Sequence, residues 1–458
     1  MKLFSGLNMQ IISISVLIPF FAIFMRIASG PTANISFIII ALYALGGRIQ
    51  AIQALALSWF FSMLNPALAP DASLASIGRY LIIIAAAISV VWRGTNSSAR
   101  FSIKRLSLFT LCLGALLLVH SLLFSAVVDV SVLKVVAWVV VMLTLLFAWQ
   151  ALATAQRVVL FDQLQWALVW LLLLSLPLLA IPGIGYLRNG TGFQGLLNHP
   201  QAFGPTVALV GVLVGGRILS ERKPAWRDIA LLGLCLVLVV LSEARTAGVA
   251  MVLGLLSSTL LSPIFAGVSR RLMLPGLRSR RFQAVALLTV AGVIMAGPLL
   301  AGKLSTYLFK RSESTSLIAA ADASRGVLIQ KMFVNIQKNP LTGIGFGVAS
   351  EPAYMEVERD PVMGLPLSAP VEKGVMPVAV LEELGIFGAG AVLSWLLVVL
   401  RRGARSGVRQ FAVLITLVLV NFGESMFFSV GGMGMLLLIL LAGAVTGEHQ
   451  MARQETHA

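Results

Sequence analysis

The chain has 458 residues, of which 58% are hydrophobic and 11% are charged, and its mean hydropathy is +0.95. Soluble domains carry about 25% charged residues, so this composition excludes an ordinary soluble protein. The formal net charge of +16 could indicate nucleic-acid binding, but the basic residues cluster in short connections between apolar runs. Membrane proteins show this charge pattern. We therefore expect the chain to lie in the lipid bilayer and to bind no nucleic acid.

Apolar segments follow one another along the chain, and several approach the roughly 20 residues that cross a bilayer as a helix. Backbone groups in lipid must hydrogen-bond within their own segment, so we predict an all-α polytopic integral membrane protein. About 14 transmembrane helices are expected. The range is 12–14, because Gly46, Gly47 and Arg48 form either a turn between two spans or a kink within one. The predicted spans are 9–27, 34–46, 49–64, 77–92, 106–124, 131–150, 163–180, 200–217, 228–241, 246–262, 282–301, 376–400, 408–421 and 426–446.

The basic connections predict the topology. Lys and Arg accumulate on the cytoplasmic side, which places 93–105, 217–227, 270–281 and 401–409 there. Both termini then lie in the cytoplasm, and the alternate connections face outward. The predicted parts are an N-terminal transmembrane bundle of about 11 spans (1–301), one large extracytoplasmic loop (302–375), C-terminal transmembrane helices (376–447) and a cytoplasmic tail (448–458).

The large loop contains one readable helix. Ser324 can cap an amphipathic helix near 324–338, which Asn339–Pro340 would end. The glycines of 343–347 predict a flexible turn, and the prolines of 351–371 predict a stretch without regular structure.

Ionisable side chains gather on the predicted outer side, and they suit the binding of an anionic, lipid-linked substrate. Guanidinium groups bind phosphate oxygens in bidentate fashion, and a nearby carboxylate can take a proton from a sugar hydroxyl. The candidates are Arg188, His199, Glu243, Arg245, Arg325, Glu372, Lys373, Glu382 and Glu383. Each also has a structural interpretation, as a solvated loop residue, a helix cap or a member of an ion pair. The histidines show no metal-ligand spacing, and we expect neither a metal nor a cofactor.

Four stretches resemble the bacterial O-antigen ligase and Wzy-type O-antigen (exopolysaccharide) polymerase family. They are GFQGLLNHPQAFGP at 192–205, LSEARTAGVAM at 241–251, SRGVLIQKMFVNIQKNPLTGIGFG at 324–347 and EKGVMPVAVLEELGIFG at 372–388. Their order and the large outer loop match the family, and the third stretch is the most specific. The rest of the chain resembles the family only in hydropathy.

The resemblance implies a metal-independent inverting glycosyltransferase of the bacterial inner membrane, with its active site facing the periplasm. Such enzymes use undecaprenyl-diphosphate-linked oligosaccharides as donors. Arg245 and Arg325 match the motif arginines that engage the diphosphate, and Arg188 matches more loosely. His199, Lys373 and Glu382 are weaker candidates for contacts with the acceptor or the sugar.

One departure from the family separates two functions. Its ligases place a histidine in the large loop shortly before the next span, but 302–375 contains no histidine and has Glu372-Lys373 at the comparable place. This favours a polymerase of an O-antigen, capsule or exopolysaccharide, with Glu372 as the catalytic base and a chain-length-regulating co-polymerase as a candidate partner. A ligase that passes the glycan to another acceptor and a lipid-linked oligosaccharide flippase or other transporter are the alternatives.

Overall fold

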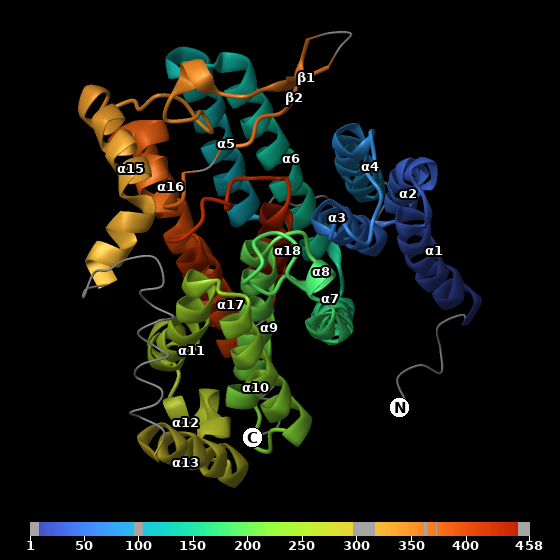
Figure 1. Ribbon diagram of the computed structural model, residues 1–458, viewed down its shortest axis with the longest axis vertical. Coiled ribbons are helices and arrows are strands. Elements are labelled where there is room, and N and C mark those ends of the chain that lie inside the picture. The colour runs from blue at the N-terminus through green and yellow to red at the C-terminus, as the bar shows by residue number, and fades with distance from the viewer. Residues whose placement is uncertain (1–8, 96–103, 296–316, 361–363, 372, 448–458) are drawn as a thin grey trace.

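The computed structural model describes residues 9–95, 104–295, 317–360, 364–371 and 373–447, which are mostly helical (Figure 1). The first half contains α1 (Met9–Ala28), α2 (Gly30–Ala44), α3 (Arg48–Met63), α4 (Ala75–Thr95), α5 (Arg105–Phe124), α6 (Val128–Ala151), α7 (Thr154–Ser175), η1 (Leu176–Ala180), α8 (Pro182–Gly185) and α9 (Pro200–Ser220). The second half contains α10 (Trp226–Leu241), α11 (Arg245–Ala266), α12 (Arg270–Met273), η2 (Pro275–Arg278), α13 (Arg280–Met295), α15 (Leu317–Lys338), η3 (Pro352–Tyr354), β1 (Glu358–Arg359), β2 (Pro366–Ser368), α16 (Met376–Ser406), α17 (Val408–Val420) and α18 (Met433–Thr446).

The structure is that of an all-α membrane protein. Within the described residues, seven helical segments are long and apolar enough to cross a membrane, namely 75–92, 105–124, 128–151, 154–180, 200–220, 245–266 and 376–406. Four shorter apolar helices accompany them. A helix overlaps every one of the predicted spans, while the number that crosses the bilayer stays a prediction.

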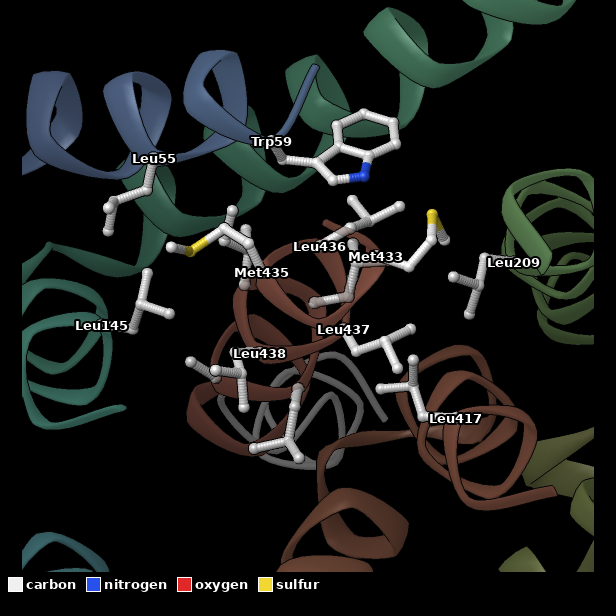
Figure 2. Close-up of a cluster of buried hydrophobic side chains, with 14 of the residues drawn as sticks. Leu55, Trp59, Leu145, Leu209, Leu417, Met433, Met435, Leu436, Leu437 and Leu438 are labelled. Carbon is white, nitrogen blue, oxygen red and sulfur yellow. The ribbon is translucent and has the colours of Figure 1, made fainter. Parts of the chain in front are cut away.

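Helix α18 forms the centre of the bundle. All of its residues are buried, as expected for a helix that is apolar all round. Figure 2 shows its Leu436, Leu437 and Leu438 among side chains from α3, α6, α9 and α17, including Leu55 and Leu145. Helix α9 lies beside it and is buried along nearly its whole length. Only Gln201 is exposed, and only Arg217 and Ser220 are partly exposed.

Large apolar side chains are exposed on the outer helices. Phe24 of α1, Leu123 of α5, Ile264 of α11 and Phe387 of α16 are each exposed by two thirds or more. Such side chains are stable on a surface that faces lipid, because hydrocarbon tails are as apolar as the side chains themselves. They therefore support the membrane location.

Three of the basic connections meet at one end of the bundle, which we call the basic end. The Arg409 guanidinium lies 2.9 Å from an Asp162 carboxylate oxygen, and Arg217 lies 3.7 Å from Asp228. Arg281 donates to the Pro224 carbonyl, 3.1 Å away. These contacts place 217–228, 281 and 409 on one side, as the charge pattern predicts.

The opposite end, which we call the loop end, carries α15 and the hairpin of β1 and β2 at the top of Figure 1. Two expectations about this region are wrong. Helix α15 already includes Leu317, so Ser324 lies inside the helix and does not cap it, and the alanines of 319–321 favour this longer helix. The proline-rich stretch contains the antiparallel pair Glu358–Arg359 and Pro366–Ser368.

A third difference concerns α18, which begins at Met433 rather than near 426. Residues 421–432 form a loop instead, which we call the α17–α18 loop. Gly432 has φ +51°, a left-handed conformation that helices exclude. This loop lies at the loop end and becomes part of the candidate site.

Candidate functional site

Helix α16 is broken near its start, and a loop fills the break. At Gly385 the backbone is non-helical, with φ +62° and ψ −172°. The amides of Ile344 and Gly345 donate to the carbonyls of Glu382 and Glu383, both at 3.0 Å, and the Ile386 amide donates to the Pro340 carbonyl at 3.0 Å. The loop thus pairs with backbone groups that an intact helix would have paired itself.

Glycine is required on both sides of this contact. Gly343 has φ +68°, and a Cβ there would lie 2.5 Å from the Glu382 carbonyl oxygen. A Cβ on Gly385 would collide with the Leu341 carbonyl. The expected flexible turn at 343–347 is therefore wrong, since Phe346 is 1% exposed and the loop is fixed by hydrogen bonds.

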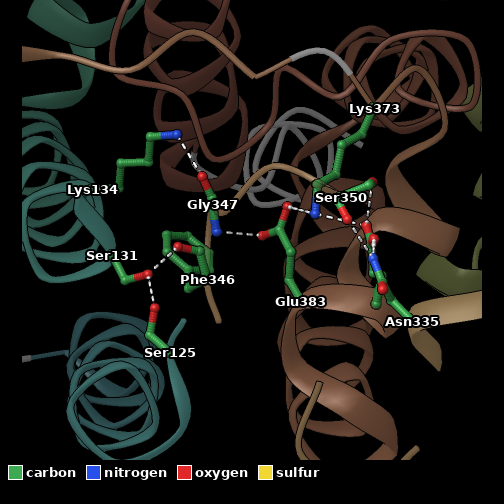
Figure 3. Close-up of polar contacts among 10 residues, drawn as sticks. Ser125, Ser131, Lys134, Asn335, Phe346, Gly347, Ser350, Lys373 and Glu383 are labelled. Carbon is green, nitrogen blue, oxygen red and sulfur yellow. Dashed lines mark hydrogen bonds and ion pairs between the residues drawn. The ribbon is translucent and has the colours of Figure 1, made fainter. Parts of the chain in front are cut away.

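A buried ion cluster lies directly above the break. Lys373 Nζ is 2.7 Å from a Glu382 carboxylate oxygen and 3.1 Å from one of Glu383, with the three side chains 1%, 0% and 12% exposed. Asn335 of α15 donates to Glu382 at 2.6 Å, and Ser350 donates to it at 3.1 Å. Buried charges are stable only when they are paired and hydrogen-bonded, and Figure 3 shows both conditions met.

Helices α5 and α6 hold the loop from its other side. His120 Nε2 lies 2.5 Å from the Thr342 carbonyl, and Ser131 donates to the Phe346 carbonyl at 2.8 Å. Lys134 Nζ donates to the Gly347 carbonyl at 2.6 Å, while the Gly347 amide donates to Glu383 at 2.6 Å. The loop therefore joins the Lys134 and Lys373 regions through one peptide segment (Figure 3).

A cavity of about 420 Å³ opens beside this segment, which we call the Arg79 cavity. Its charged lining groups are Arg79, Lys134, Lys373 and Glu383. The rest of the lining includes 367–371 at the end of the hairpin, several residues of the α17–α18 loop, and apolar side chains of the surrounding helices. Three cations and one carboxylate make this a cavity that suits an anion.

A second cavity, of about 470 Å³, is lined by Pro66, Leu187, Arg188, Asn198 and His199. We call it the His199 cavity. His199 is the N-cap of α9, where its Nδ1 accepts the Gln201 amide hydrogen at 2.9 Å. The structure thus brings together the predicted site residues Arg188 and His199.

The turn between α10 and α11 packs against the loop that carries Arg188. The Phe193 amide donates to the Leu241 carbonyl at 2.9 Å, and the Thr191 hydroxyl donates to Glu243 at 3.0 Å. Glu243 has φ +56°, which is uncommon for a residue with a Cβ and often marks a functional turn. Arg245 begins α11 immediately after this turn.

The α17–α18 loop connects these regions. Several of its residues line the Arg79 cavity, and a Cβ on Gly423 would meet Thr246, the neighbour of Arg245. Gly432 approaches Met63, close in sequence to Pro66 of the His199 cavity. All four stretches that carry the family resemblance therefore meet at the loop end, directly or through this loop.

The other predicted site residues have different surroundings. Glu372 lies outside the described residues, although both of its neighbours, Val371 and Lys373, line the Arg79 cavity. Arg325 belongs to α15, but the structure does not describe its side chain. Glu382 is fully buried in the ion cluster and lines neither cavity, so the structure gives no support to a sugar contact.

Sequence reasoning missed Arg79 and Lys134. Each is a single cation inside an otherwise apolar segment, SIGRYLIII and SVLKVVAWVVV. Charged residues at such depth are costly and are usually functional, so this signal could have identified them.

No family model and no curated protein matches the sequence. Among the residues that the structure describes, no group of three or more His, Cys, Asp or Glu side chains could hold a metal ion. The function must therefore be argued from the geometry and from the motifs in the sequence.

Proposed function

We propose that this chain is a polysaccharide polymerase, an inverting glycosyltransferase that joins undecaprenyl-diphosphate-linked repeat units at the outer face of the bacterial inner membrane. The observation that supports it best is the meeting of the four motif stretches at the loop end, beside two cavities that carry basic side chains. A reaction between two lipid-linked glycans needs two binding regions at the level of the lipid headgroups, and the loop end offers two.

The proposed reaction is a single displacement. A hydroxyl oxygen of the acceptor sugar attacks the anomeric carbon of the donor glycan and forms the new glycosidic bond. The bond from that carbon to the diphosphate oxygen breaks, and undecaprenyl diphosphate leaves with the electron pair. The hydroxyl proton passes to a carboxylate, for which Glu372 is the candidate base.

Arginines stabilise the leaving diphosphate in this proposal. Arg245 and Arg325 keep the role that the motifs imply, with Arg188 in the His199 cavity as a further contact. Glu383 is less suited to proton transfer, because one oxygen is held by Lys373 and the other by the Gly347 amide. In this proposal Glu383 holds Lys373 in position at the cavity wall.

The test is reconstitution. Purified protein in lipid nanodiscs is incubated with lipid-linked repeat units, and a ladder of longer lipid-linked glycans is expected. Arg245→Ala and Arg325→Ala should each abolish the ladder, while Lys331→Gln should keep it. Lys331 is a matched control because it is a cation of α15 that is half exposed, pairs with Glu351 at 2.5 Å and lines neither cavity. A full ladder from Arg325→Ala would show that its assigned role is wrong.

Deletion of the gene separates the remaining functions. A polymerase mutant attaches single repeat units to the final acceptor, whereas a ligase mutant accumulates polymer on the lipid carrier. A protein that moves lipid-linked sugars across liposomes without forming glycosidic bonds would be a flippase. Either of the last two results would replace the proposed activity.

A further inference from the structure

Among the residues that the structure describes, Arg79 has no counter-ion within ion-pair distance. Its guanidinium stacks on the neighbouring Tyr80 ring, 5.2 Å from the centroid, and lines the Arg79 cavity. Its Nε is shielded from solvent and has no hydrogen-bond partner, and no described carboxylate lies within ion-pair distance of the group. Leaving a shielded charged donor unpaired is unfavourable, so this guanidinium is suited to pair with a ligand.

Lys134 lines the same cavity and also has no ion-pair partner among the described residues. Its Nζ donates to the Gly347 carbonyl, but no described carboxylate forms an ion pair with it. Lys373, by contrast, is already held by Glu382 and Glu383. Arg79 and Lys134 are therefore the two cations of the cavity that form no ion pair with a described carboxylate, although the charge of Glu383 also acts on Lys134 from a greater distance.

The depth of these residues favours a lipid headgroup over a soluble anion. Arg79 is the fifth residue of α4 and Lys134 is the seventh of α6. At 1.5 Å per residue they lie about 6–9 Å from the helix ends. A helix that enters the bilayer at its first residues would hold such side chains near the boundary between the headgroups and the hydrocarbon. The strand β2 contributes Leu367 and Ser368 to the cavity wall on the side of the loop end, and the Tyr80 hydroxyl anchors the strand by donating to the Leu367 carbonyl at 3.1 Å.

We propose that Arg79 and Lys134 bind the diphosphate of a second lipid-linked substrate, the acceptor repeat unit. This rests on the proposed polymerase function and adds to it a site for the other substrate. The donor arginines cannot serve both substrates at once, because each diphosphate brings its own negative charge. The cavity volume of about 420 Å³ falls in the range that binds small molecules, which suits a diphosphate and the sugar attached to it.

Binding can be tested without any glycosyl transfer. Native mass spectrometry of the full chain in nanodiscs, titrated with undecaprenyl diphosphate, should detect two bound molecules per chain. Arg79→Gln and Lys134→Gln should each weaken the binding of one molecule by roughly tenfold to a hundredfold, the range expected for lost charged hydrogen bonds. Lys331→Gln should bind two molecules as the unchanged protein does, and Arg79→Lys should recover part of the loss.

Competing ligands distinguish the source of the anion. Inorganic pyrophosphate should displace the second molecule weakly, and nanodiscs rich in phosphatidylglycerol should not displace it. Equal displacement by phosphatidylglycerol would make this a phospholipid site, and a single bound molecule in the unchanged protein would also overturn the proposal. Ladder formation is measured separately in the same preparations, so two bound molecules without any ladder would contradict the polymerase activity and not the diphosphate site.

Discussion

Replacing Lys373 with methionine tests the ion cluster at the break of α16. The substitution keeps the length of the side chain and removes the only cation in contact with Glu382 and Glu383 among the described residues. Two carboxylates would then share a buried site without a counter-charge. We expect lower stability rather than a change confined to activity.

The structure sets the size of the effect. Removing one partner of a buried ion pair costs about 3–5 kcal/mol, since it leaves an uncompensated charge. Glu382 keeps its hydrogen bonds from Asn335 and Ser350, and Glu383 keeps that from the Gly347 amide. These donors reduce the loss, and we expect about 3 kcal/mol, the lower end of that range.

Thermal unfolding of the purified protein, followed by tryptophan fluorescence in detergent, measures this loss. A mid-sized domain loses about 2–4 °C per kcal/mol and a longer chain less, so Lys373→Met should unfold a few degrees earlier. The triple variant Lys373→Met, Glu382→Gln, Glu383→Gln should recover much of the difference, because neutral amides need no counter-charge. An unchanged unfolding temperature in Lys373→Met would refute the reasoning that this cluster stabilises the fold.

Four further predictions follow from the structure. Gly385→Ala should prevent normal folding, because it combines an unfavourable φ of +62° with a collision at Leu341. The control Gly390→Ala has open space around it and should be neutral or stabilising by up to about 1 kcal/mol. The yield of folded protein on size-exclusion chromatography compares the two variants. Leu437→Ala in the centre of the bundle should cost about 2–5 kcal/mol, measured by the same unfolding assay. A cysteine at the exposed position 354, replacing Tyr354, should react with a membrane-impermeant maleimide added outside intact cells. A cysteine replacing Arg222 at the basic end should react only after the inner membrane is permeabilised, and the reverse pattern would contradict the topology.

Hydropathy predicted the helices well because lipid removes the alternatives. A backbone in hydrocarbon must satisfy its hydrogen bonds locally, so an apolar run of sufficient length has one stable form. Even short segments such as α2, Gly30–Ala44, were found in this way.

The break in α16 could not be predicted by the same reasoning. Gly385 lies in an apolar, helix-like pattern, and nothing in its neighbours requires a left-handed backbone. The break exists because a loop about 40 residues earlier, at 340–345, supplies the missing hydrogen-bond partners. Such a contact depends on the tertiary structure, and a local pattern does not contain it.

The candidate site was predicted in part for a related reason. Arginines such as Arg188 and Arg245 are predicted because they lie on the outer side and because guanidinium groups bind phosphate oxygens. Arg79 and Lys134 were overlooked because each is one charge in an apolar segment, and their common cavity appears only when α4 and α6 are packed together. The significance of a lone cation depends on whether another element supplies its counter-charge.

The break also changes how the family resemblance should be interpreted. The most specific stretch, NPLTGIGFG, supplies the loop that fills the break, and ELG of 383–385 supplies the break itself. These residues are explained by backbone geometry and packing, so their presence alone does not indicate a particular reaction. A substitution within 343–347 would lower activity by unfolding the site, whatever the chemistry is. The chemistry must therefore be tested at the cations of the proposed binding sites, such as Arg245 and Arg79, rather than within this loop.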